Sequence, residues 1–130
     1  MAATSPLQAA RVAEAPRRLE ICRTAILLRD FAALAEVTER DSMLMHAVMM
    51  TSTPALFYRQ EASLVVIEEV RKARARGLAA CTTVDAGPNV HVICEQEAAQ
   101  DVVRLVRDIP GVEEIRLAKV GGAAQLVEEN

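Results

Sequence analysis

The chain has 130 residues, 52% of them hydrophobic, and this length and composition predict one domain with a single modest core. The formal net charge is −3, and the aromatic residues are two Phe, one Tyr and no Trp. This acidic balance, with few rings to stack on bases, argues against a nucleic-acid-binding protein.

The cysteines and the N-terminal segment bear on location. Cys22, Cys81 and Cys94 are odd in number and widely spaced, which argues against a disulfide framework and favours reduced thiols. MAATSPLQAARV, residues 1–12, has no apolar core of the kind that a secretory signal needs. The apolar runs are much shorter than a membrane span. We therefore expect a cytoplasmic protein that does not enter a membrane.

The N-terminal third is predicted to be helical. Ser5 before Pro6 is a favourable N-cap, so we expect a first helix over about residues 6–14. Pro16 has no backbone N–H to donate. It should break or kink this helix and start a second one near residue 15.

Two further helices are expected. Asp30 is the predicted N-cap of a helix over about residues 31–49. Another covers about residues 60–75 and ends with Gly77 as its C′ residue. Its predicted inward side chains are Leu64, Ile67 and Val70.

The hydrophobic period then changes from helix to strand. β-Branched content predicts strands over residues 78–84 and 90–95, joined by a hairpin-length connection at 85–89. A helix is expected over 97–108 and a third strand over 112–120. The last strand, helix and strand would form a compact crossover unit.

These elements predict an α+β fold with helices packed on one face of a small sheet. The order suggests a ferredoxin-like split βαβ fold, which normally opens with a strand before the first helix. No strand-like segment precedes Ser5, so this first strand looks missing. Either another chain completes the sheet, or the chain is a piece of a longer protein. Unpaired strand edges would also favour a homodimer.

Three motifs carry a family resemblance: DSMLMHA at residues 41–47, STPALFY at 52–58 and DAGPNV at 85–90. Their order and spacing resemble the C-terminal domain of diphosphomevalonate decarboxylases, in the superfamily of galactokinase, homoserine kinase and mevalonate kinase. The similarity runs from about residue 4 to residue 125. We therefore interpret residues 1–130 as one such C-terminal domain.

The resemblance implies a lyase of the mevalonate pathway of isoprenoid biosynthesis. Such a decarboxylase uses ATP to phosphorylate the 3-hydroxyl of mevalonate 5-diphosphate. Loss of that phosphate and of carbon dioxide then gives isopentenyl diphosphate. By position, the catalytic carboxylate beside this hydroxyl would be Asp85.

Elementary chemistry supports a carboxylate at this position. A tertiary alcohol is a poor nucleophile, and a carboxylate within hydrogen-bond reach can orient it or accept its proton. Gly87 would allow an unusual backbone angle or a close substrate approach, and Pro88 would stiffen the turn. We expect Ser42, Gly87 and Asn89 to bind substrate.

Structural alternatives exist for these residues. Asp85 could be an ordinary turn aspartate that bonds local amides. Ser42 and His46 share a helical face and, with Asp41, could form a buried polar cluster that ties the helix to its neighbours. Asn89 could serve the hairpin turn alone. No metal site is expected, because the H-x-x-C spacing of His91 and Cys94 is not a zinc signature.

The chain lacks several parts that the resemblance requires. It has no Gly-rich phosphate cradle. In the family that loop, and an arginine that handles the substrate carboxylate, lie in the N-terminal domain. ATP and Mg²⁺ would therefore bind through the absent N-terminal half, and the chain alone would be inactive. A mevalonate 5-phosphate decarboxylase or a mevalonate 3-kinase remains open, as does a non-catalytic α+β module that binds a partner or a small ligand.

Overall fold

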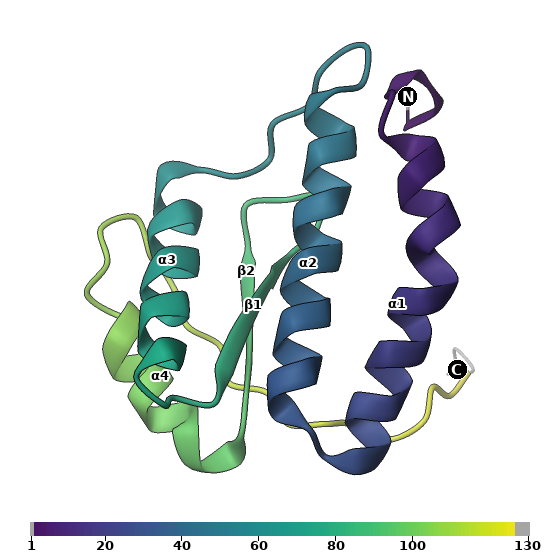
Figure 1. The fold of residues 1–130 in the computed structure, drawn as a ribbon. Helices are drawn as coiled ribbons and strands as arrows, with labels where there is room; N and C mark the ends of the chain where they lie inside the picture. Colours follow the sequence, from purple (N-terminus) through teal and green to yellow (C-terminus); the bar gives the residue numbers. More distant parts are fainter. Residues whose placement is uncertain (1, 127–130) are drawn as a thin grey trace.

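Four α-helices and one antiparallel pair of strands make up most of residues 2–126, the part of the chain that the computed structural model describes (Figure 1). Two short 3₁₀ turns, η1 and η2, complete the regular structure. In chain order the elements are η1 (Ala2–Thr4), α1 (Gln8–Leu28), α2 (Phe31–Met50), α3 (Glu61–Ala75), β1 (Ala80–Val84), β2 (Val90–Cys94), η2 (Gln96–Ala98) and α4 (Ala99–Val106).

The sheet has helices on one face. β1 and β2 pair with Ala80 opposite Cys94 and Val84 opposite Val90. On one face the strands and the helices α3 and α4 share a core, made by Val66, Val70, Ala80, Val102, Val106 and Ile109. On the other face His91 and Ile93 are exposed. The predicted α+β fold, with helices on one face of a small sheet, is therefore confirmed.

The remaining helices extend the molecule sideways. α2 lies along the edge of β1 that does not face β2, and α1 packs antiparallel on the outer side of α2 (Figure 1). Asp30 caps α2 as predicted, since its Oδ1 accepts a hydrogen bond from Ala33 N at 3.0 Å. No helix of the described part is long and apolar enough to cross a membrane.

The predicted break at Pro16 is wrong, because α1 continues through it from Gln8 to Leu28. Pro16 removes the hydrogen bond to the carbonyl of Val12, but both residues are exposed, so water can reach that carbonyl. Arg11 and Arg18, on either side of the proline, both bind Asp41 of α2. These tertiary contacts hold the helix together across the proline.

The start of α1 also differs from the prediction. The helix begins at Gln8 rather than at residue 6. Ser5 does bond the following turn, since its Oγ accepts from Leu7 N at 3.2 Å. The same hydroxyl lies 2.6 Å from Thr51 Oγ1, so Ser5 also joins the start of α1 to the end of α2.

α3 has the predicted extent but a different inward face. Gly77 follows it with a φ of +102°, as expected of a C′ glycine. Leu64, expected inward, is 52% exposed, whereas Ser63, Val66, Val70 and Ala73 are buried. The helix is therefore rotated so that a serine of its first turn faces the sheet.

The predicted third strand at residues 112–120 is wrong. This segment has no strand pairing, and Leu117 and Val120 are exposed. A strand requires a neighbour to bond its backbone groups, and this segment has none among residues 2–126. The crossover unit expected from it is therefore not formed.

Candidate functional site

Asp85 stands at the end of β1, where the chain leaves the sheet. It opens the five-residue loop 85–89 that joins β1 to β2. Its side chain is 80% exposed, and its Oδ2 lies 3.7 Å from Nε2 of His91. The carboxylate is thus available to a ligand while its backbone continues a paired strand.

The residue before Asp85 is held from behind by α2. Ser42 Oγ donates to the carbonyl of Val84 and accepts from its N–H, both at 3.1 Å. His46, one turn further along α2, places Nε2 3.0 Å from the same carbonyl. Ser42 and His46 therefore form the buried polar cluster that was the structural alternative for them. This cluster restrains the backbone on which Asp85 is mounted.

The environment of His46 favours the neutral imidazole. Its side chain is 2% exposed, and this burial lowers its pKa. The hydrogen bond to Val84 acts in the opposite direction. The charge of Arg59 lowers the pKa further, and that of Asp85 raises it. Because a carbonyl only accepts hydrogen bonds, the contact with Val84 assigns the proton of the neutral ring to Nε2.

The far end of the loop is held by α3. Ser63 Oγ donates to the carbonyl of Pro88 at 2.9 Å, and Ser63 is 3% exposed. Sequence reasoning missed this residue because Leu64 was assigned to the inward face. The helical spacing could have indicated it. Ser63 precedes Val66 by three residues and Val70 by seven, which places all three on one side of a helix.

Gly87 is half-buried in the loop, and Asn89 is exposed. The φ of Gly87 is outside the left-handed range, so the unusual backbone angle expected there is not found. A side chain added at Gly87 would meet nothing within 4 Å, which leaves room for a ligand to approach the backbone. Asn89 is exposed, and its side chain has no hydrogen-bond partner among residues 2–126.

Charged side chains complete the edge of β1 that faces away from β2. Arg74 donates to both carboxylate oxygens of Glu39, at 2.5 and 2.6 Å, and to the carbonyl of Ala80 at 3.1 Å. Glu39 also accepts from Thr82 N at 3.2 Å. With the contacts to Val84, this gives side-chain partners to outward backbone groups of Ala80, Thr82 and Val84. The strand is therefore fixed along its whole length.

Two other polar residues are excluded from the site. Asp41 binds Arg18 Nε at 2.8 Å and Arg11 Nη2 at 3.4 Å, so it joins α1 to α2. Burial raises the pKa of Cys81 to about 11, which makes this thiol a poor nucleophile near neutral pH. Within residues 2–126 no three His, Cys, Asp or Glu side chains are grouped to hold a metal ion.

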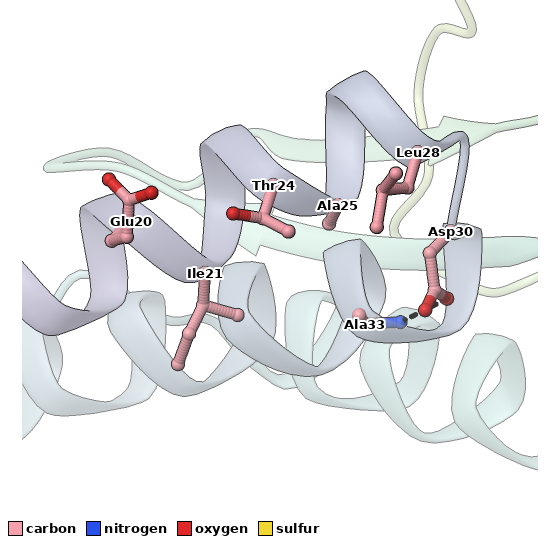
Figure 2. A pocket seen from close by; sticks show the side chains of 7 residues that line it. All are labelled: Glu20, Ile21, Thr24, Ala25, Leu28, Asp30 and Ala33. Carbon is pink, nitrogen blue, oxygen red and sulfur yellow. Dashed lines mark hydrogen bonds between the residues drawn. The ribbon is translucent and has the colours of Figure 1, made fainter.

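A shallow hollow of about 220 Å³ lies between α1 and the first turn of α2 (Figure 2). Figure 2 shows Ile21, Ala25 and Leu28 among its lining side chains, and the hydrogen bond from Ala33 to Asp30. Its charged side chains, Glu20 and Asp30, are both acidic. This composition does not fit a phosphorylated ligand.

A second hollow beside it is lined by Arg29 and by two acidic residues, Asp30 and Glu95. Ser42 lies nine residues beyond Ala33 along α2, or about 13 Å at 1.5 Å per residue, so both hollows are remote from the Asp85 loop. Neither fits a nucleoside triphosphate and its magnesium ion. We assign no ATP-binding residue to the described part of this chain.

Comparison with known proteins identifies the family. Residues 1–126 match the model of the mevalonate 5-diphosphate decarboxylase C-terminal domain. The chain belongs to this family. The predicted resemblance is therefore confirmed, and Asp85 lies in the DAGPNV motif on which that resemblance partly depends.

Individual relatives agree with the family. The chain is 44% identical over 102 residues to the diphosphomevalonate decarboxylase of Candida albicans, covering 78% of this chain and 28% of that protein. It is 31% identical to the phosphomevalonate decarboxylase of Haloferax volcanii, covering 99% of this chain and 40% of that protein. The chain thus spans less than half the length of either relative.

The fold agrees with a solved relative. The structure of MDDEF in complex with MVAPP, AMPPCP and magnesium superposes with a TM-score of 0.77 at 28% identity. The match covers 83% of this chain and 33% of that one. AMPPCP is an analogue of ATP, so an adenine nucleotide and magnesium bind that relative.

Proposed function

We propose that this chain is the substrate-side domain of an ATP-dependent decarboxylase acting on mevalonate 5-diphosphate. In the overall reaction mevalonate 5-diphosphate and ATP give isopentenyl diphosphate, carbon dioxide, ADP and phosphate. The observation that carries the proposal is the exposed carboxylate of Asp85, mounted between two anchored backbone positions. The family match supplies the reaction, and the geometry supplies the group that this domain contributes.

The chemical task of Asp85 is to handle the tertiary hydroxyl. Its carboxylate accepts a hydrogen bond from the hydroxyl and orients the oxygen for attack on phosphorus. It can also take the hydroxyl proton as the new bond to phosphorus forms. His91, 3.7 Å away, is placed to stabilise the carboxylate when the imidazole is protonated.

The neighbouring residues keep this carboxylate in position. Ser42 and His46 hold Val84, and Ser63 holds Pro88, so the loop is restrained at both ends. Ser42 is buried and its hydroxyl is occupied by Val84, which favours a positioning role over direct substrate contact. Asn89 is exposed and a side chain at Gly87 would meet nothing within 4 Å, so these two are the stronger candidates for touching substrate.

A second candidate function is the decarboxylation of mevalonate 5-phosphate. The relative from Haloferax volcanii carries that name and aligns over 99% of this chain. The two reactions differ in one phosphate and share the tertiary hydroxyl. Asp85 would therefore have the same role in both, and parallel assays with the two substrates decide between them.

The proposal extends to cofactors, location and assembly. ATP and Mg²⁺ bind through the rest of the intact protein, and the chain alone is inactive. The three free cysteines fit a cytoplasmic location.

A homodimer would pair through the outer edge of β2, because side chains already occupy the outer edge of β1. Light scattering that shows a monomer at high concentration would exclude this dimer.

The test is Asp85→Asn in the intact protein, assayed for ATP-dependent release of carbon dioxide. We expect kcat to fall about 10²- to 10⁴-fold, the usual contribution of a positioned acid–base group. The melting temperature should stay unchanged because the side chain is exposed. Asp108→Asn is the matched control, since that side chain is 83% exposed and lies beyond α4. Undiminished turnover in Asp85→Asn would remove Asp85 from the mechanism.

A further inference from the structure

Arg59 has an unusual environment for an arginine. It lies just before α3 and is partly buried. Its Nη1 contacts the Met43 sulfur at 3.8 Å, while its buried Nε has no hydrogen-bond partner within residues 2–126. Burial of the guanidinium lowers the pKa of Arg59. A desolvated cation whose partner is a thioether is a costly arrangement.

Arg59 adjoins the supports of the Asp85 loop from two directions. Met43, which it touches, follows Ser42, and Ser42 binds the residue before Asp85. Along the chain, Arg59 leads into the first turn of α3, where Ser63 binds the far end of the loop. The charges of Arg59 and Asp85 also both act on His46. The two elements that Arg59 contacts or leads into are therefore the ones that restrain the Asp85 loop at its two ends.

Arg59 and Asp85 do not neutralise each other. The ion pairs within residues 2–126 include none between them, and Asp85 has His91 as its neighbour. On α2, which Arg59 contacts through Met43, the carboxylates of Glu39 and Asp41 are paired with Arg74 and Arg18. The site thus presents one exposed acidic group and one partly buried basic group, and the two form no ion pair with each other.

We propose that Arg59 binds an oxyanion, a carboxylate or phosphate group, of the same ligand whose hydroxyl meets Asp85. This rests on the proposed function. A phosphorylated mevalonate has its tertiary hydroxyl between a carboxylate and a phosphate ester, so an oxyanion lies a few bonds from the oxygen that Asp85 orients. A charge-assisted bond to it would give the buried Nε–H of Arg59 the acceptor that it lacks. Arg59 is then a binding and specificity residue.

The test uses Arg59→Met in the intact protein, because methionine preserves the aliphatic stem and its packing on Met43. We expect the KM for mevalonate 5-diphosphate to rise about 10- to 100-fold, the loss expected for one charge-assisted hydrogen bond. The kcat and the KM for ATP should change little. Arg59→Lys should recover part of the loss. Arg71→Met, at an exposed arginine paired with Glu68, is the matched control.

Inhibition by the product identifies the oxyanion. Isopentenyl diphosphate has the phosphates of the substrate but neither its carboxylate nor its hydroxyl. Weaker product inhibition in Arg59→Met assigns the contact to a phosphate, and unchanged inhibition assigns it to the carboxylate. Where Arg59→Met lowers the melting temperature, Arg59→Gln is used in its place.

The failures of the two proposals are distinguishable. An unchanged KM for the mevalonate substrate in Arg59→Met, or an increase confined to ATP, overturns the role of Arg59. With Asp85→Asn inactive in the same assay, the proposed function survives that result. A wild-type protein that releases no carbon dioxide from either phosphorylated mevalonate overturns both.

Discussion

Two adjoining regions use polar residues in opposite ways. In the first, which we call the α2–β1 seam, Glu39, Ser42 and His46 bind the backbone of β1. In the second, the Asp85 loop (residues 85–89), Asp85 and Asn89 are exposed. The side chains of the seam form hydrogen bonds with buried backbone groups, whereas the polar side chains of the loop are free to bind solvent or a ligand.

The difference has an energetic basis. A buried backbone group without a partner costs about 1–3 kcal/mol, so each seam residue protects the fold against such a loss. An exposed carboxylate can be hydrated at little cost and is available to bind a ligand. A rigid seam beneath an open loop places a functional group without burying it. Substitutions in the seam should therefore affect stability, and those at the tip of the loop should affect activity.

The largest effect on stability is expected for Glu39→Ala. This change leaves the guanidinium of Arg74, whose side chain is 27% exposed, without its bidentate partner. It also removes the acceptor for Thr82 N. We expect a loss of about 2–4 kcal/mol in the free energy of unfolding, measured by urea denaturation.

Glu68→Ala provides the contrast, because its pair with Arg71 lies on the exposed side of α3. That substitution should cost less than about 1 kcal/mol. Equal losses in the two variants would mean that the seam is no more important to stability than a surface ion pair.

An intermediate effect is expected for Ser42→Ala, which leaves the buried N–H of Val84 without an acceptor. The free energy of unfolding should fall by about 1–3 kcal/mol. Ser63→Ala should cost less, about 1 kcal/mol, because Pro88 is exposed and water can replace the lost donor. Urea denaturation of both variants compares the seam with the loop directly. A greater loss in Ser63→Ala would reverse the comparison.

The smallest effect concerns pH and tests the burial of His46. Its pKa is lowered in the folded protein, so the unfolded chain binds more protons as the pH falls below about 6.5. This contribution to stability is present above that pH. It is lost as the pH falls toward the folded pKa, by at most about 1.4 kcal/mol per pH unit for one proton.

Urea midpoints measured between pH 7.5 and pH 5.5 check this dependence. His46→Gln should flatten it, because that substitution removes the group whose pKa burial lowers. A pH dependence in His46→Gln equal to that of the wild type would show that other groups cause it.

Local patterns predicted much of the site and little of what surrounds it. The strand, turn and strand around Asp85 were predictable because β-branched runs and an Ala-Gly-Pro-Asn turn act over a few residues. The bond from Ser63 to Pro88 spans 25 residues, and the bond from Glu39 to Thr82 spans 43. Arg59 could not be found from the sequence, because only the tertiary structure reveals that its Nε is buried without a hydrogen-bond partner among residues 2–126.

The sequence by itself determined the helix start at Asp30, the helix end at Gly77, the hairpin that carries Asp85 and the family. Each of these depends on neighbouring residues or on a short motif. The tertiary structure decided that α1 continues through Pro16, that Ser63 rather than Leu64 faces the sheet, and that residues 112–120 form no strand. These outcomes depend on distant packing partners: α2 supports the proline, the sheet selects the face of α3, and a strand needs a neighbour.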